Sequence, residues 1–201
     1  MLTNRQIAHI RGLPVDQVAN TQIQDVPEVT GGGETILVSR LHSIGAIAAL
    51  TEDTAYFVFL GTVKRNLTAL RIFCTVTTAG VGAQTAEMGL FSTPTAPNRV
   101  GQVLTKLTAT GVVDALTSQG VVGNTDSFAY EVPAGIQLWA GIRTAMAGTE
   151  PWLWGLNADM SYGRVLSTAT AGALTASTTF TGALISPTTA WQAPALTLHV
   201  A

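Results

Sequence analysis

The sequence is dominated by short segments in which apolar and polar residues alternate, and this pattern constrains the fold more than any other feature. In Leu67–Thr78, every second residue from Leu70 to Val76 is apolar, which predicts a strand with one apolar face. Seven further segments have a strand-like composition, and glycine and proline residues lie between them. The eight predicted strands are Thr54–Leu60, Leu67–Thr78, Gln84–Ser92, Val100–Leu107, Thr125–Val132, Ile136–Ala145, Trp152–Leu156 and Leu196–Val200.

No helical period separates these strands, and this absence predicts an all-β, antiparallel fold. About eight strands around one core favour a jelly-roll-like β-sandwich. An up-and-down barrel is the alternative, because the pattern does not reveal the strand order.

The first part of the chain lacks the alternating pattern of the predicted strands. Thr3 followed by Gln6 has the spacing of a helix capping box, and Gly12 and Pro14 would end that helix. The following polar stretch ends in the triple glycine 31–33, which is typical of an extended connection. We therefore predict two parts: residues 1–34 as an N-terminal arm with a short helix, and residues 35–201 as the β-sandwich domain. The alternative is an N-terminal helix that packs on its own domain.

A second atypical segment lies near the other end of the chain. Residues 167–189 are rich in Thr, Ser, Ala and Gly. Thr and Ser support β-structure and glycine interrupts it, so we expect a long excursion with one or two short strands. Excursions of this length in compact domains are commonly functional or covered by a partner.

The composition indicates a protein that works within an assembly. Hydrophobic residues make up 47% of the chain, but charged residues only 11%, which is less than half of the usual share of about 25%. The polar surface must therefore come largely from residues such as the 30 threonines. The net charge of −2 argues against a nucleic-acid partner, which would require a basic stripe. A secreted β-domain with a neutral surface is the alternative to an assembly protein.

The sequence contains no recognisable targeting segment. The longest apolar run, Ile44–Leu50, spans seven residues, against the roughly 20 needed to cross a bilayer. We therefore expect synthesis in a cytoplasm and no membrane partner. The single cysteine, Cys74, excludes an internal disulfide and is expected to be a small buried hydrophobe.

Catalytic motifs are absent from the sequence. The histidines His9, His42 and His199 lie far apart and have no neighbours at metal-ligand spacing. The triple glycine lacks the Lys and Ser/Thr of a phosphate loop, and there is no nucleophile-elbow motif. We expect no enzyme activity, no catalytic residue, no metal and no cofactor.

Carboxylates on strands could still serve a glycosidase, which uses a pair of them. Glu52 and Asp53 are expected in the turn before a strand, while Glu87 and Glu131 lie within strands. We interpret the strand carboxylates as rim residues or as partners of a mid-strand arginine, Arg71 or Arg143. A carbohydrate-active enzyme that uses Glu87 or Glu131 is the less favoured hypothesis.

Two of the four tryptophans, Trp152 and Trp154, stand two residues apart and therefore share one face of a strand. We expect them to pack in the core or at a subunit interface, where tryptophan is enriched. The alternative is an exposed platform that stacks on sugar rings. In that case Leu153 would point to the opposite side.

Several segments of the sequence are similar to structural proteins of tailed bacteriophages, of the decoration, head-fibre or tail-accessory kind. The resemblance covers roughly residues 40–185 and lies in AYFVFLGTV, VTTAGVGAQTAEMGLFSTPTAPNRVGQVLTKL, GIQLWAGIRTAM and LWGLNADMSYGRVLSTATAGAL. It implies β-sandwich domains, symmetric assembly, no cofactor and a place in the virion after synthesis in the host bacterial cytoplasm.

Together these patterns predict a virion structural protein that docks on a capsid or tail lattice and stabilises or decorates the particle. The expected partners are capsid, portal or tail proteins, contacted by the arm through Ile7, Ile10 and Leu13. The resemblance further favours a homo-oligomer, and specifically a trimer. The alternative function is a receptor-binding or carbohydrate-binding module of the same particle.

Overall fold

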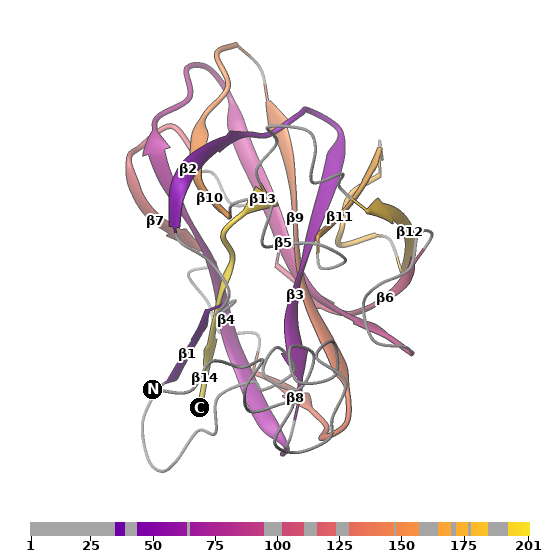
Figure 1. The fold of residues 1–201 in the computed structure, drawn as a ribbon. Helices are drawn as coiled ribbons and strands as arrows, with labels where there is room; N and C mark the ends of the chain where they lie inside the picture. Colours follow the sequence, from indigo (N-terminus) through magenta and orange to yellow (C-terminus); the bar gives the residue numbers. More distant parts are fainter. Residues whose placement is uncertain are drawn as a thin grey trace, which may run out of the picture.

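The computed structural model describes residues 35–38, 44–63, 65–94, 102–110, 116–123, 129–146, 148–156, 165–169, 172–176, 178–184 and 193–201. Within these ranges the chain forms β-strands joined by turns and contains no helix (Figure 1). The strands are β1 (Thr35–Val38), β2 (Ile44–Ala49), β3 (Thr54–Thr62), β4 (Leu67–Thr78), β5 (Gln84–Thr93), β6 (Gln102–Ala109), β7 (Gly120–Gly123), β8 (Tyr130–Val132), β9 (Gln137–Met146), β10 (Trp152–Leu156), β11 (Val165–Ala169), β12 (Thr179–Leu184), β13 (Ala193–Pro194) and β14 (Thr197–Val200).

The all-β, antiparallel prediction is confirmed, but the prediction of about eight strands was too low for the described part of the chain. The eight predicted segments appear as β3, β4, β5, β6, β8, β9, β10 and β14. The strands that were not predicted are β1, β2, β7 and β13, which have two to six residues each. Strands β2, β7 and β13 contain alanine, glycine or proline, which are depleted in strands. Strands β11 and β12 match the one or two short strands expected around residues 167–189. The predicted helix and arm, residues 1–34, lie outside the described residues.

The first sheet is built around β4, which pairs with β7, β8, β10 and β14. Strand β1 extends the sheet beyond β14, and both β2 and β13 pair with β10. All of these pairings are antiparallel. Strand β14, near the end of the chain, thus lies between β1 and β4, which come much earlier in the sequence (Figure 1).

The second sheet closes on itself as a six-stranded barrel in the order β11-β12-β6-β5-β9-β3. Its longest ladder joins β5 to β9, from Gln84 opposite Met146 to Thr93 opposite Gln137. The excursion around residues 167–189 supplies β11 and β12, and these two strands complete the barrel by pairing with β3 and β6. One of the expected short strands, β11, therefore begins at Val165, two residues before the excursion of residues 167–189.

The two sheets share a hydrophobic core. Val58, Met88 and Ile142 of the barrel pack in the same cluster as Ile72 and Leu153 of the first sheet. Cys74 belongs to this cluster with 2% of its surface exposed, which confirms that it is a small buried hydrophobe.

One residue of the predicted inward face of β4 was placed wrongly. Leu70 is only partly buried, and Ala69 is fully buried in its place. The reason is an irregularity in the pairing with β14, where His199 is opposite Arg71 but Val200 is opposite Ala69. A bulge of this kind shifts the alternation by one residue.

A second core fills the barrel on the other side of the same strands, and it is rich in aromatic residues. Phe57, Phe91 and Phe180 form three ring contacts with centroid distances of 4.9 to 5.6 Å. A side chain on Gly141 would place its Cβ 2.7 Å from the Phe57 ring and 2.9 Å from the Phe91 ring. Because side chains on β3 enter the two cores alternately, its nearly continuous apolar run is buried on both faces.

Candidate functional site

The two tryptophans of the sequence analysis lie on the outer face of the first sheet. Trp152 and Trp154 are 46% and 47% exposed, while Leu153 between them is fully buried in the core. The alternation across β10 is thus as predicted. Of the two expected locations for the indoles, the core of this chain was wrong, whereas a subunit interface stays a prediction. The apolar side of β10 is already occupied by Leu153, which leaves the indoles on the solvent side.

The strand that carries these tryptophans is held on both sides. β2 pairs with it along its length, with Ala49 opposite Trp152 and Ile47 opposite Trp154. On the other side, β4 pairs with Trp152 and Leu153. The hydroxyl of Thr77 donates a hydrogen bond to the carbonyl oxygen of Trp152 at 3.1 Å. The backbone beneath the indoles is therefore part of a sheet rather than of a loop.

Neighbouring outward residues of the same sheet are uncharged. On β4, Thr75 and Thr77 alternate with the buried residues Cys74 and Val76, and both threonines are partly exposed. Val121 of β7 lies opposite Thr75 and is 71% exposed. The side-chain amide of Gln119 donates to the carbonyl oxygen of Thr77 at 2.9 Å. We call Trp152, Trp154, Thr75, Thr77, Gln119 and Val121 the tryptophan face.

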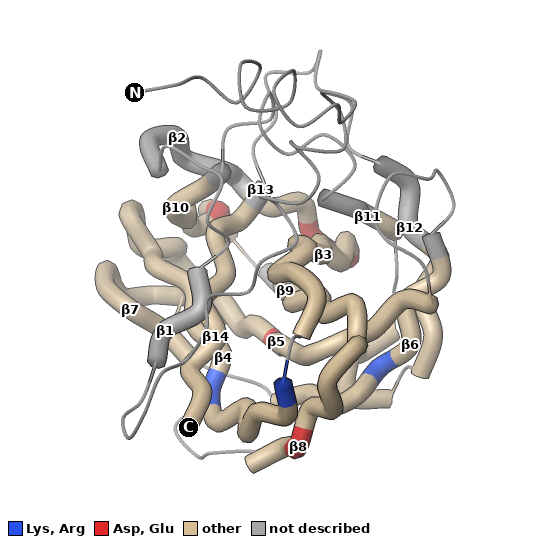
Figure 2. Tube along the Cα trace, turned by 60° about the horizontal axis from the view of Figure 1, so that its bottom comes forward, with Lys and Arg blue, Asp and Glu red and all other residues tan. Residues whose placement is uncertain are grey.

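Strands β2, β7 and β10 of this sheet contain no charged residue, and β4 contains a single one, Arg71. Figure 2 shows how few charged positions the described chain has and how scattered they are. The charged residue that comes nearest to the tryptophans along the chain is the exposed Glu150. The tryptophan face is therefore an aromatic, hydroxyl-bearing surface, and the one basic residue in its strands is the exposed Arg71, four residues before Thr75 on β4.

A buried carboxylate lies in the barrel. Glu87 on β5 is 6% exposed, and its Oε2 accepts a hydrogen bond of 2.6 Å from the backbone N–H of Leu174. Its Oε1 accepts a longer hydrogen bond of 3.4 Å from the Thr175 hydroxyl. The Lys106 ammonium group donates to the carbonyl oxygen of Thr175. Two charged side chains of β5 and β6 thus hold the turn that precedes β12.

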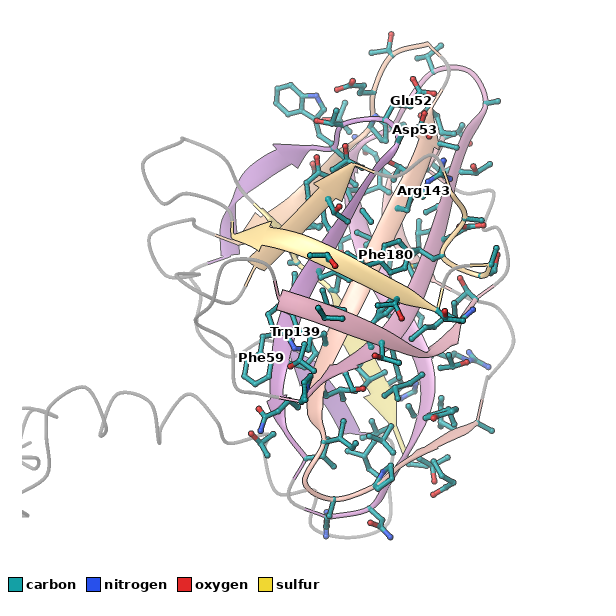
Figure 3. The ribbon with its side chains drawn as sticks, turned by 90° about the vertical axis from the view of Figure 1, so that its right-hand side faces the viewer. Glu52, Asp53, Phe59, Trp139, Arg143 and Phe180 are labelled. Atoms are coloured by element: carbon teal, nitrogen blue, oxygen red, sulfur yellow. The ribbon has the colours of Figure 1, made fainter. Side chains whose placement is uncertain are left out.

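Arg143, one of the two predicted arginine partners, lies directly opposite Glu87 in the register of β5 and β9. It also forms an ion pair with Asp53 at 2.5 Å. Asp53 has a φ of 53° in the turn before β3, and Glu52 belongs to the same turn, as predicted. In Figure 3, Asp53 and Arg143 lie toward one end of β9, Phe59 and Trp139 lie toward the other, and Phe180 lies between them.

The two strand carboxylates of the glycosidase hypothesis are not brought together. Glu87 belongs to the barrel, whereas Glu131 is exposed on β8 of the other sheet and accepts a hydrogen bond of 2.6 Å from the Thr68 hydroxyl. Glu87 binds a backbone amide of its own chain, which is a structural use of a buried carboxylate. The sequence contains one indication that Glu87 has a structural role, because it is the only charged residue in β5.

Within the described ranges, no group of three or more His, Cys, Asp and Glu residues could hold a metal ion. The same part of the chain has no helix that could span a membrane. The arm residues Ile7, Ile10 and Leu13 lie outside the described residues.

The thiol of Cys74 gives a testable pH dependence. Burial raises the pKa of this thiol from its ordinary value of 9.0 to about 12. We therefore expect no reaction with a thiol reagent in native buffer at about pH 8 and full reaction in denaturant. Above pH 9 the unfolded thiol ionises while the folded one stays neutral, so the free energy of unfolding should fall until the pH passes about 12. Stoichiometric labelling of the native protein within minutes would contradict the burial.

The chain matches no model of a known protein family, and no curated protein matches its sequence.

Proposed function

We propose that this chain is a non-enzymatic structural protein of a tailed-bacteriophage virion, which docks on a capsid or tail lattice through its N-terminal arm. The observation that carries the proposal is the order of the strands. In one sheet the pairings run β2-β10-β4-β7, and in the other they run β3-β9-β5-β6.

We interpret this order as a jelly roll. With β7 and β8 counted as one interrupted strand, there are eight positions along the chain from β2 to β10. The chain changes sheet at every step except from β5 to β6, which are neighbours in one sheet, as in a jelly roll of two Greek keys. Jelly rolls are the domains of viral capsids and of lectins. A fold alone does not establish a function, so the strand order supports the proposal as an analogy.

The charge content supports an assembly. With 11% charged residues, the chain has little of the mixed surface charge that keeps a free monomer soluble. We propose a homo-oligomer, specifically a trimer, that contacts capsid, portal or tail proteins. Light scattering of the purified protein at micromolar concentration tests this directly, and a stable monomer would count against it.

The arm can be tested in the full-length chain. We expect Ile7→Asp combined with Ile10→Asp to abolish incorporation into particles, because a charge on the apolar side of the arm would oppose burial against a partner. The melting temperature should change by only a few degrees, since the arm is proposed to lie outside the β-domain. Copy number per purified particle is the readout.

Val103→Asp is the matched control, because Val103 is an apolar residue on β6 that is 44% exposed. It should be incorporated at the normal level. Normal incorporation of the Ile7/Ile10 variant would overturn the role of the arm, and a large loss of its thermal stability would place these residues in the domain.

A second candidate function is a receptor-binding or carbohydrate-binding module of the same particle. The observation that favours it is the half-exposed pair Trp152 and Trp154 on the outer face of the first sheet. Attachment of the purified protein to host cells, and its loss in tryptophan variants, tests this candidate independently of incorporation.

A further inference from the structure

We infer that the tryptophan face is a binding site for an uncharged glycan chain, whose sugar rings stack on Trp152 and Trp154. This inference rests on the second candidate function and is independent of docking on the lattice. Four properties of the site carry it: the spacing of the indoles, the pairing of their strand on both sides, the polar groups beside them and the low number of basic residues in the described strands of the face.

The spacing suits a ligand with repeated rings. Residues two apart on a strand project to the same side, with their Cα atoms about 6–7 Å apart. Trp152 and Trp154 are exposed to nearly the same extent, 46% and 47%, so both indoles offer surface to one ligand. A single sugar would use one indole, whereas a short oligosaccharide can contact both.

The strand is fixed before any ligand arrives. Leu153 anchors β10 in the core between the sheets, and β2 and β4 pair with this strand on either side. A platform of this kind loses little conformational entropy on binding, which favours affinity.

Polar groups of the right kind stand beside the indoles. Hydroxyl groups of Thr75 and Thr77 lie on the adjacent strand, and the Gln119 amide group contacts the backbone of Thr77. Hydroxyls and amides can donate and accept hydrogen bonds, which matches the hydroxyl groups of a sugar. Aromatic faces combined with such groups form an amphipathic surface.

The charge pattern selects the class of glycan. Acidic glycans and nucleic acids need Lys or Arg. Strands β2, β7 and β10 contain neither, and β4 contains a single arginine, the exposed Arg71, four residues before Thr75. The exposed Glu150, two residues before Trp152, would repel an anion further. An uncharged oligosaccharide complements this surface.

The size of the apolar patch argues for a narrow ligand rather than a protein. On the strands of this sheet whose side chains the structure describes, which leaves out β1 and β2, the exposed large hydrophobic residues are Trp152, Trp154 and Val121. A stable protein interface buries about 800 Å² on each partner, which is more than two half-exposed indoles and a valine supply. The outer surface of the other sheet is not available in the same way, because β11 and β12 close it into a barrel.

The test uses the full chain and immobilised oligosaccharides built from neutral hexoses and N-acetylhexosamines, with matched oligosaccharides that contain uronic or sialic acid. We expect binding to at least one neutral series and none to the acidic series. Trp152→Ala and Trp154→Ala should each weaken binding about tenfold or more, as expected for aromatic hot spots. Trp154→Phe should retain part of the affinity, and Val103→Ala should bind normally because Val103 is exposed on the other sheet.

Two results would overturn the inference while leaving the second candidate function intact: preferential binding of acidic glycans, or tryptophan-dependent attachment to host cells without binding of any neutral glycan. Loss of the oligomer in both alanine variants, without glycan binding by the wild type, would assign the face to contacts between copies instead. Absence of tryptophan-dependent attachment to any glycan or cell would overturn the inference and the second candidate together.

Discussion

Replacing Trp139 by alanine is expected to lower the free energy of unfolding by about 3–5 kcal/mol, as for other fully buried tryptophans. Trp139 is completely buried in the barrel, and its ring centroid lies 5.2 Å from that of Phe59. Its indole N–H also donates a hydrogen bond of 3.0 Å to the Thr93 hydroxyl. Because domains are typically stable by only about 5–15 kcal/mol, this loss would be visible in a urea titration followed by far-ultraviolet circular dichroism.

Trp152→Ala is the matched control, since it removes the same side chain from a position that is 46% exposed. It should reduce stability clearly less than Trp139→Ala. Equal losses for the two variants would mean that Trp152 is buried in solution, either in the chain or between copies. A small loss for Trp139→Ala would contradict the aromatic core of the barrel.

Replacing Glu87 by alanine is the second large effect, with an expected loss of about 2–3 kcal/mol in the free energy of unfolding. The substitution leaves the buried N–H of Leu174 without the carboxylate oxygen that accepts it at 2.6 Å. Leu174 is itself fully buried among the aromatic residues of the barrel. We therefore expect faster hydrogen exchange of the Leu174 amide in addition to the global loss.

Two variants separate this role from a general effect of charge. Glu87→Gln keeps an acceptor oxygen and should lose less stability than Glu87→Ala. Glu131→Ala removes an exposed carboxylate that accepts a hydrogen bond from the Thr68 hydroxyl, and its effect should stay within about 0.5 kcal/mol. Unchanged exchange at Leu174 in Glu87→Ala would show that the carboxylate does not hold this turn.

The two tryptophan positions have opposite environments although both belong to strands of alternating pattern. Trp139 faces the interior of the barrel, where it belongs to the aromatic core and its ring lies beside that of Phe59. Trp152 faces outward from a sheet whose outer side has no covering layer among the described residues. This difference makes Trp152 and Trp154 available for a ligand and makes Trp139 a structural residue.

Strand positions could be predicted from the sequence because alternation is a local property. Each of the eight predicted segments contains a strand, although Thr125–Val132 is described as a strand only over Tyr130–Val132, and Cys74 is buried as expected. The same reasoning placed Glu52 and Asp53 in a turn and put Leu153 on the opposite side from the two tryptophans. Each of these predictions depends on residues within a few positions of one another.

The pairing of distant segments could not be predicted. The composition of residues 167–189 predicts one or two short strands, but it does not reveal that β11 and β12 close the barrel around the aromatic core of Phe57, Phe91 and Trp139. The run Thr54–Leu60 is apolar on both faces because each face enters a different core. The sequence shows the apolar run, but it does not show that two separate cores lie on its two sides. The bulge that replaces Leu70 by Ala69 on the inward face likewise depends on the register with β14.

The sequence by itself therefore determined that the chain is rich in antiparallel strands, that it carries few charges, and that Leu153 lies on the opposite side of β10 from the two tryptophans, since these follow from local alternation and composition. Only the tertiary structure decided that the barrel closes, that Glu87 holds the turn at Leu174, and that Trp139 is buried while Trp152 and Trp154 are exposed. The physical reason is that a strand has two faces, and which of them is covered depends on segments that lie far away in the sequence.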